Sequence, residues 1–289
     1  MKKILILYKE RRPEQEDLFL KTAQELKINL VQALYSDLLV KFMDGSFDIT
    51  IHNHDLSSFD LVYFRHFEKN SGNQTLVCQY CIDKSIPLID SIFSQQKLWT
   101  NYKSFDYLQL SKIGISVIPS YLVSKNNIQL IEDKLSYPIV SKINDGSKGE
   151  GVHLCSNSQE LHQLLTNYQT PMIVQPYIEN TGDLRLFVIG DNVIAAIKRI
   201  NQDPTEFRNN VSLGGKAIEH QATKEETELA LRATKALLYD IAGVDIITDQ
   251  NGKQYIMEVN MAPQFAGVMQ ATGIDIPLKI MEYLVSRCK

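Results

Sequence analysis

Short apolar runs alternate with amphipathic stretches over roughly the first 95 residues of the chain. The runs KILILY, INLVQAL, FDITI, DLVYF and PLID have the character of strands, while EDLFLKTAQEL and TLVCQYCIDK have helical spacing. This alternation predicts an open α/β domain over residues 1–95. A long helical stretch is expected next, from about Ser94 to Lys112, and Gly114 is a typical residue to end it.

The pattern changes after Gly114 and predicts an α+β arrangement with antiparallel strands. Strands YPIVSKI and VHLC flank the glycine-rich segment NDGSKGEG, and a helix from Ser158 to Tyr168 and a strand MIVQ follow. Two hairpins are expected, LRLFVI with VIAAIKR and VDIIT with QYIMEVN, separated by a helix from about Thr223 to Tyr239. The expected fold class is therefore α/β and α+β.

The second hairpin carries polar groups in an otherwise apolar strand. Asn251 and Gly252 predict a two-residue turn, and that register sets Asp245 directly opposite Glu258, with Asn260 one pleat along on the same face. Facing carboxylates need a proton, a cationic side chain or a metal ion, and two carboxylates with an amide oxygen suit Mg²⁺ bound to a nucleotide. We interpret these three residues as metal ligands, with a shared proton or a buried ion pair as the alternative.

Other segments are candidates for binding the nucleotide itself. GSKGEG, residues 146–151, is a strand–loop–strand glycine loop whose backbone can approach phosphate oxygens, although a plain turn is the alternative. Lys142 lies in the apolar strand before this loop, and Lys103 interrupts the long helical stretch, so both are candidate phosphate contacts. Pro176 offers only a carbonyl and Ile178 can donate, a spacing that fits adenine.

The first hairpin predicts a second charged cluster. A turn at Asp191 and Asn192 would set Arg185 opposite Lys198 on the neighbouring strand. Because like charges directly opposite one another are destabilising, this register favours an anion between them.

Composition limits the classes of function. The net charge of −4 and the pI near 5.9 argue against a nucleic-acid binder. The N-terminal apolar run is shorter than the ~7–15 residues of an export signal, and no segment approaches the ~18 apolar residues of a membrane span. We therefore expect a soluble, cytoplasmic protein without nucleic acid or membrane as a partner. Four scattered cysteines do not make a disulfide framework, and neither CQYC nor the HNH triplet completes a metal site.

Several motifs together resemble one superfamily. In order, Lys103, VSKINDGSKGEGV, VQPYI, GDLR, FRNNVSLGG, AGVDI and MEVN resemble the ATP-grasp superfamily, and AGVDI, MEVN and TGIDIP are most similar to its RimK-like glutamate ligases. The resemblance covers about residues 90–285. It implies a pre-ATP-grasp domain (1–95) and a two-subdomain ATP-grasp fold, with a central or lid subdomain that carries the glycine loop (96–175) and a C-terminal subdomain that carries the metal site (176–289).

The resemblance also implies roles for the matching residues. Asp245, Glu258 and Asn260 would hold one or two Mg²⁺ ions, with Mn²⁺ as an alternative. The residues implied to face the γ-phosphate and the substrate carboxylate are Arg185, Arg199, Arg208 and Asn210, and Arg208 would stabilise the transferring group unless it forms a surface ion pair. The other residues implied to bind ATP are Lys103 and Lys142 at the phosphates, the loop residues Gly146, Ser147, Gly149 and Gly151, the adenine segment Gln175, Pro176, Tyr177 and Ile178, and Asp183 near the ribose.

The implied function is an ATP-dependent carboxylate–amine ligase that acts through an acyl phosphate on an amino acid, peptide or protein carboxylate. Two alternatives stay open: a relative that closes links within a peptide through a leader-binding surface, and a non-catalytic ATP-binding module. Gln264 and Ala266 replace a glycine and an acidic residue of the family pattern, and Leu213 replaces a basic one. These changes fall near where the acceptor amine should enter, so the sequence leaves open whether glutamate is the added amino acid. It also does not name the substrate pair or the oligomeric state, a homo-oligomer included.

Overall fold

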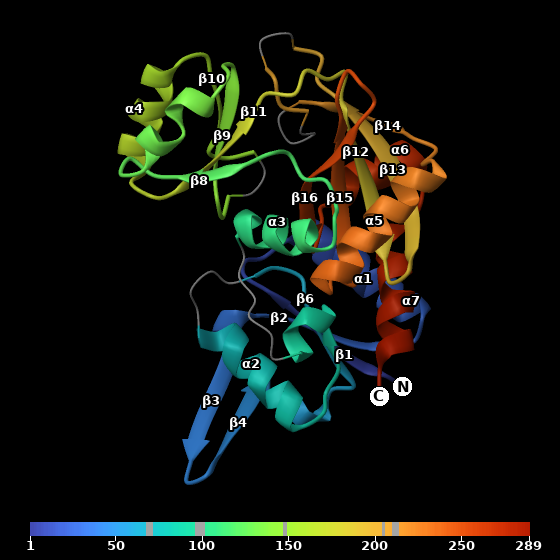
Figure 1. Ribbon diagram of the computed structural model, residues 1–289. Coiled ribbons are helices and arrows are strands. Elements are labelled where there is room, and N and C mark those ends of the chain that lie inside the picture. Colours follow the sequence, from blue (N-terminus) through green and yellow to red (C-terminus); the bar gives the residue numbers. More distant parts are fainter. Residues whose placement is uncertain (68–71, 96–101, 147–148, 204–205, 210–213) are drawn as a thin grey trace.

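The computed structural model describes residues 1–67, 72–95, 102–146, 149–203, 206–209 and 214–289. Its N-terminal part is built on a parallel sheet with the order β2-β1-β6-β7 (Figure 1). These strands are β1 (Lys3–Tyr8), β2 (Asn29–Leu34), β6 (Leu61–Phe64) and β7 (Leu88–Ile89), and the helices beside them are α1 (Pro13–Glu25) and α2 (Gly72–Asp83). The sequence pattern predicted this open α/β unit.

Alternate residues of β1 point into two different cores, as expected for a parallel sheet that is buried on both faces. Leu5 and Leu7 lie in a core that α2 helps to cover, and Ile4 and Ile6 lie in a core that includes Phe19 of α1. An antiparallel sheet of β3 (Leu38–Met43), β4 (Ser46–Ile51) and β5 (His54–Asp55) is attached, and its first two strands form a projecting hairpin (Figure 1). Only β4 was predicted, as the strand FDITI.

The middle of the chain forms a small antiparallel sheet with the order β10-β9-β11-β8, which we call the lid sheet. Its strands are β8 (Tyr121–Val123), β9 (Ile139–Ile143), β10 (Val152–Cys155) and β11 (Met172–Pro176), and α4 (Ser158–Tyr168) packs on it. The helix before it, α3, spans Lys103–Lys112. The prediction of one long helix from Ser94 was therefore wrong, because the chain forms a separate 3₁₀ turn at Ser91–Ser94.

The C-terminal part is an antiparallel sheet with the order β14-β13-β12-β15-β16. Its strands are β12 (Asp183–Ile189), β13 (Asn192–Ile200), β14 (Lys216–Glu219), β15 (Ile241–Thr248) and β16 (Gln254–Met261). Helix α5 (Lys224–Leu237) buries its apolar stripe in one core, and α6 (Ala266–Thr272) and α7 (Ile276–Arg287) lie in the other. Thr223 caps α5 with a reciprocal bond to Glu226, as the acidic start KEETE suggests.

Further 3₁₀ turns lie at Tyr35–Asp37, Leu56–Ser58, Ile128–Leu130 and Glu132–Lys134. Cys78 and Cys81 both lie on α2, and burial raises the pKa of the Cys78 thiol to about 12. His52 and Asn53 form the turn between β4 and β5. None of the helices in the described part of the chain is long and apolar enough to cross a bilayer.

Candidate active site

The β15–β16 hairpin places Asp245 directly opposite Glu258, as predicted. The predicted two-residue turn was wrong, however, because Asp249 pairs with Lys253 and the turn contains three residues, with Gly252 at a φ of +82°. A β-bulge at Met257 then adds one residue to β16 and restores the expected register beyond it. The two deviations cancel, and both carboxylates lie on one face of the sheet.

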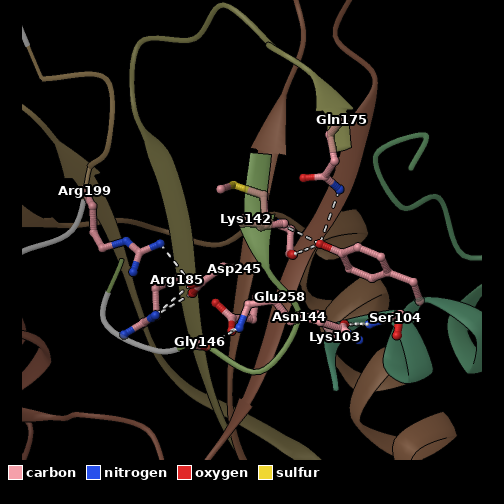
Figure 2. A network of polar contacts seen from close by, with 12 residues as sticks. Lys103, Ser104, Lys142, Asn144, Gly146, Gln175, Arg185, Arg199, Asp245 and Glu258 are labelled. Carbon is pink, nitrogen blue, oxygen red and sulfur yellow. Dashed lines mark hydrogen bonds and ion pairs between the residues drawn. The ribbon is translucent and has the colours of Figure 1, made fainter. Parts of the chain in front are cut away.

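Cationic side chains neutralise both carboxylates. Asp245 accepts a bidentate ion pair from Arg185, with both N–O distances at 2.7 Å, and a further bond from Arg199 at 3.0 Å (Figure 2). Lys103 contacts Glu258 at 2.8 Å. Burial alone would raise the pKa of the Asp245 carboxyl, but the two guanidiniums outweigh it and hold that pKa below its usual value.

The predicted pairing of Arg185 with Lys198 was wrong. The turn lies at Gly190 and Asp191, one residue earlier than predicted, because Ile189 pairs with Asn192. A bulge at Ile194 offsets only part of this shift, so Arg185 lies between Ile197 on one side and Asp245 on the other. The anion expected beside Arg185 is thus a carboxylate of the neighbouring strand. Arg199 pairs in the same way with Asp183, at 2.6 Å, across β12 and β13.

Lys142 lies on β9 with only 7% of its surface exposed. Its Nζ contacts the Tyr107 hydroxyl at 2.7 Å, that hydroxyl donates to the Met257 carbonyl at 2.7 Å, and Gln175 Nε2 lies 3.4 Å from the same hydroxyl (Figure 2). Burial lowers the pKa of Lys142 to about 8, against the raising effect of the Glu258 and Asp245 charges. Tyr107 therefore ties the lid sheet to the strand that carries Glu258.

The N-terminus of α3 is fastened to the start of the glycine loop. Asn144 accepts the Lys103 amide through its carbonyl and the Ser104 amide through Oδ1, both at 2.9 Å, and Lys103 Nζ donates to the Gly146 carbonyl. These contacts place Lys103 between the loop and Glu258 (Figure 2). Helix α3 begins at Lys103. The Lys103 side chain therefore lies at a helix N-terminus, where bound anions are favoured.

The glycine loop connects β9 and β10, as predicted. A Cβ on Gly146 would lie 2.4 Å from Ile143 Cγ1, and a Cβ on Gly151, which has a φ of +66°, would lie 2.8 Å from the same side chain. Gly149 also has a positive φ, +80°. Glycine is thus required here by Ile143 and by backbone conformation. Ser147 lies outside the described residues.

Arg208 reaches the same loop from the segment between β13 and β14. Its Nη1 donates to the Gly149 carbonyl at 2.9 Å, and its Nε and Nη2 bind Glu206 at 2.8 and 2.6 Å. This structure therefore contains the ion pair that was the alternative for Arg208. Asn210 lies outside the described residues.

One cavity between the lid sheet and the C-terminal sheet collects most of the predicted nucleotide residues. Tyr177 donates its backbone N–H to the Pro138 carbonyl at 3.2 Å, which fixes the 175–178 segment beside β9. The predicted residues that line the cavity are Lys103, Lys142, Gly146, Gly149, Gln175, Pro176, Tyr177, Ile178, Asp183, Arg199, Arg208, Asp245 and Glu258.

A second cavity adjoins the first and extends toward the N-terminal sheet. Lys103, Gly146, Arg199 and Glu258 line both cavities, so the two meet at this group. Arg185 and Asn260 line only the second cavity, together with residues of the N-terminal half and of the segment after β16. The remaining lining residues include Lys9, Arg12, Arg65, Asp106, Met261, Ala262, Pro263 and Gln264.

The donor set at this junction fits a hard divalent cation. Asp245 and Glu258 face each other, and Asn260 follows on the same face of β16. The Nδ2 of Asn260 is buried without a hydrogen-bond partner in the described residues. The ligand to a cation would be the other amide atom, the carbonyl oxygen Oδ1. Within the same residues, no group of three or more His, Cys, Asp or Glu side chains is placed to hold a metal ion, so the candidate set here is two carboxylates and one amide oxygen.

Sequence reasoning missed some residues of the site. Tyr107 and Asn144 organise it through hydrogen bonds, and Asn180, Phe207 and Asn209 line the first cavity. Asn144 precedes a glycine-rich loop, where Asn side chains often bond to nearby backbone, and this signal could have identified it. Tyr107 has helical spacing from Lys103 but no motif around it.

Comparison with known proteins agrees with this arrangement. A protein of Haemophilus influenzae named "Probable alpha-L-glutamate ligase" is 36% identical over 181 residues, which cover 61% of this chain and 60% of that protein. A protein of Shewanella frigidimarina named "Probable alpha-L-glutamate ligase 1" is 33% identical over 250 residues, which cover 83% of this chain and 81% of that protein. The chain thus spans about 60% of the length of relatives such as the Haemophilus protein.

Solved structures agree with the fold over the whole chain. The ATP-grasp ligase PsnB, bound to a precursor variant, Mg and ADP, superposes with a TM-score of 0.77 at 15% identity, covering 100% of this chain and 99% of that one. The macrocyclase MdnC of Microcystis aeruginosa, bound to its precursor peptide, gives a TM-score of 0.74 at 16% identity over 98% and 99% of the two chains. Residues 100–284 match the RimK-like ATP-grasp domain family. The chain belongs to the RimK-like ATP-grasp family.

Proposed function

We propose that this chain is an ATP-dependent carboxylate–amine ligase. The observation that carries the proposal is the junction of the two cavities, where Lys103, Arg199 and Glu258 line both. A nucleotide in the first cavity and a carboxylate in the second would meet at this group. Such proximity converts a reaction between two molecules into one between neighbouring groups.

The chemistry follows from the charges around this junction. A substrate carboxylate oxygen attacks the γ-phosphorus, ADP leaves, and an acyl phosphate forms. An amine then attacks the carbonyl carbon and expels phosphate, so that one proton is released for each amide formed. Lys103, Lys142, Arg185 and Arg199 offset the negative charge of the phosphates and of the incoming carboxylate.

The residues proposed for the metal are Asp245, Glu258 and Asn260. One or two Mg²⁺ ions, or Mn²⁺, would supply charge neutralisation at the phosphate oxygens. Binding the ion requires the side-chain cations to move from the carboxylates toward the phosphates. Arg185 and Lys103 are placed for such an exchange, because each already contacts one of the two carboxylates.

The remaining assignments are also proposals. We assign adenine to the backbone of Pro176 and Ile178, the ribose to Asp183, and the closing contacts on the phosphates to residues 146–151, Arg208 and Asn210. The division into units at 1–95, 96–175 and 176–289 is likewise proposed. We further propose a cytoplasmic protein, as a monomer or homo-oligomer, that acts on a small-molecule or peptide carboxylate and an amine without nucleic-acid or membrane partners.

ADP release tests the proposal. L-Glutamate and glutamate-ended peptides are suitable probes, because the curated relatives bear glutamate-ligase names. We expect ADP release to require both an acid and an amine, and Glu258→Gln to lower the rate by roughly 10²-fold or more while the melting temperature stays near that of the wild type. Glu219→Gln, an exposed change in the same sheet, is the matched control.

Each other outcome would indicate a different function for this chain. Wild-type turnover in Glu258→Gln would contradict the metal assignment. ATP binding without turnover across the panel would favour a binding module, and turnover only with a leader-bearing peptide would favour a peptide-modifying ligase. The fold of PsnB and MdnC, whose structures contain precursor peptides, supports including such peptides in the panel.

A further inference from the structure

Arg65 is a buried arginine of the N-terminal half whose role neither the nucleotide site nor the metal site explains. It follows β6 directly, at the carboxyl end of the parallel sheet, and its side chain has 0% exposure. In sheets of this kind ligands bind near the carboxyl ends of the strands. Arg65 also lines the second cavity, although its side chain has no exposed surface.

The contacts of Arg65 are with the backbone that follows β16. Its Nη1 donates to the Ala262 carbonyl and its Nη2 donates to the Pro263 carbonyl at 2.9 Å, while its guanidinium carbon lies 5.1 Å from the Phe265 ring centroid. No carboxylate in the described part of the chain forms an ion pair with Arg65. Its two terminal nitrogens are therefore satisfied by the turn at Ala262 and Pro263 and its face by one aromatic ring, while its Nε is buried without a hydrogen-bond partner in the described residues.

That turn is strained and close to the proposed metal ligand. Ala262 has a φ of +47°, a left-handed conformation that is unfavourable for alanine, and it lies two residues after Asn260. Pro263 packs against β15, since a Cβ on Gly243 would lie 3.0 Å from Pro263 Cβ. Gly243 is the cross-strand partner of Asn260. A shift of the turn would therefore displace Asn260 in two ways, directly along β16 and through Gly243 on β15.

An arginine suits this position better than a lysine. The guanidinium presents several N–H groups in a rigid plane, which lets one side chain bind two successive carbonyls and stack on a ring. A lysine keeps the charge but has a single ammonium group on a flexible stem. The geometry thus depends on the guanidinium, and charge alone does not reproduce it.

We propose that Arg65 is a positioning residue for the ligase reaction, which holds the 262–263 turn and so shapes the second cavity, where the substrate carboxylate is proposed to bind. The proposal rests on the proposed function for its kinetic consequences. It gives the N-terminal half a part in the site, because an arginine of its parallel sheet fixes backbone that follows the metal strand. Nucleotide binding, on the other side of the junction, does not depend on it.

Three variants test the proposal. Arg65→Lys removes the planar guanidinium that binds the two carbonyls. Ala262→Gly, added to Arg65→Lys, removes the need to hold an alanine in the left-handed conformation, because glycine adopts that conformation freely. Arg11→Gln is the matched control, since Arg11 is exposed and pairs with Glu16 on the surface. The measurements are steady-state ADP release with the glutamate probes and amide hydrogen exchange over residues 260–265.

In Arg65→Lys we expect the KM for the acid probe to rise about tenfold, as for a lost charged hydrogen bond, while the KM for ATP stays within about twofold. Amide exchange over residues 260–265 should become faster, and the added Ala262→Gly should recover most of the KM. Wild-type KM and exchange in Arg65→Lys, or no recovery in the double variant, would overturn the proposal.

Two further arms keep the test decisive. If Arg65→Lys alone does not fold, the double variant decides: recovery of the folded protein by Ala262→Gly supports the proposal, and no recovery counts against it. If the wild type releases no ADP with any probe, the proposed function fails. The exchange measurement, which needs no turnover, still decides whether Arg65 holds the turn.

Discussion

Lys142 is a cation buried among partners that only partly compensate it. Its Nζ contacts the Tyr107 hydroxyl, and its ring-centroid distance of 5.4 Å to Tyr107 adds a cation–π contact. Burial lowers its pKa to about 8, since the charges of Glu258 and Asp245 offset only part of the desolvation. The charged form of Lys142 becomes more stable when a phosphate group binds beside it, because the phosphate replaces the stabilisation that water would give.

Nucleotide affinity should therefore depend on pH through Lys142. Below pH 8 the amine is charged and can contact a phosphate, whereas above pH 8 the free protein must first bind a proton, which weakens binding by about tenfold per pH unit. We expect the metal-free Kd for ATP to rise between pH 8 and 9.5. Lys142→Met should bind ATP weakly at every pH and show a flat profile.

The same pKa gives a stability signature with a defined sign. Because the folded pKa lies below the unfolded value of about 10.4, the unfolded chain binds more protons between these values, and this contribution to stability rises with pH over that window. Lys142→Met should lack this rise. Lys125→Met, which changes an exposed lysine of the lid, should keep both the rise and the Kd profile, and a flat Kd profile in the wild type would contradict the role of Lys142.

The glycine loop shows how an element can depend on one apolar side chain. Gly146 and Gly151 close over Ile143, so the loop is packed down on the end of β9. This position leaves its outer side facing the first cavity, which Gly146 and Gly149 line. The loop and the nucleotide pocket are thus shaped by the same contact.

Gly146→Ala should weaken nucleotide binding by displacing the loop. The new Cβ would lie 2.4 Å from Ile143 Cγ1 and 3.0 Å from the Glu150 carbonyl, which is too close for either to stay in place. We expect the Kd for ATP to rise about tenfold or more, and Ile143→Ala in the same chain to restore part of it by removing the clashing atoms. Calorimetric titration of ATP measures both effects.

Gly72→Ala provides the control for that experiment, since its added Cβ meets no heavy atom within 4 Å and its φ is not positive. It lies at the start of α2, where alanine has the higher helix propensity. Its ATP affinity should equal that of the wild type. Equal affinity in Gly146→Ala as well would mean that the loop tolerates displacement.

Sequence patterns predicted elements better than registers, and the two hairpins show why. Local periodicity identified all four strands, but each hairpin contains a bulge, at Ile194 and at Met257, that no local pattern announces. The Asp245–Glu258 pairing was predicted correctly because the longer turn and the bulge offset each other. Arg185 was misplaced because the first turn lies one residue earlier than predicted and the bulge at Ile194 offsets only part of that shift. Its ion-pair partner was not foreseen, because pairing of β12 with β15 joins segments about 60 residues apart.

The whole molecule has two apolar cores that the N-terminal and C-terminal sheets share, and a third core that belongs to the lid sheet and its helix. The N-terminal and C-terminal sheets contribute to the same two apolar clusters, whereas the lid core consists of residues 123–174 alone. Figure 1 shows the lid sheet set apart from the rest, with both chain termini on the side away from it. The N-terminal and C-terminal sheets should therefore unfold together.

Asp90 stands where the two sheets meet. Its carboxyl is fully buried, and its Oδ1 accepts the backbone N–H groups of Asp240 and Ile241 at 2.7 and 2.8 Å. Asp240 in turn accepts the Ser91 amide and the Tyr283 hydroxyl. Burial, and then the neighbouring Asp240 charge, raise the pKa of Asp90 well above its usual value.

This raised pKa predicts how the stability of the joined sheets varies with pH. A carboxyl that binds its proton more tightly when folded contributes stability at low pH, and that contribution is lost as the pH rises through the folded pKa. Asp90→Asn keeps the carbonyl acceptor and cannot ionise. Its melting temperature should match the wild type near pH 4 and exceed it at pH 8 by at least about 2 °C, as a gain of roughly 1 kcal/mol implies for this size.

Two further variants separate charge from hydrogen bonding at this junction. Asp90→Ala leaves two buried N–H groups without an acceptor, so it should be less stable than the wild type at low pH, by about 1–3 kcal/mol for each group. Asp191→Asn, in the exposed turn between β12 and β13, should leave the pH profile unchanged. If the melting temperature of Asp90→Asn followed that of the wild type across pH 4–8, the pH dependence of stability would not come from the proton on Asp90. The buried carboxyl would then have to be charged throughout this range.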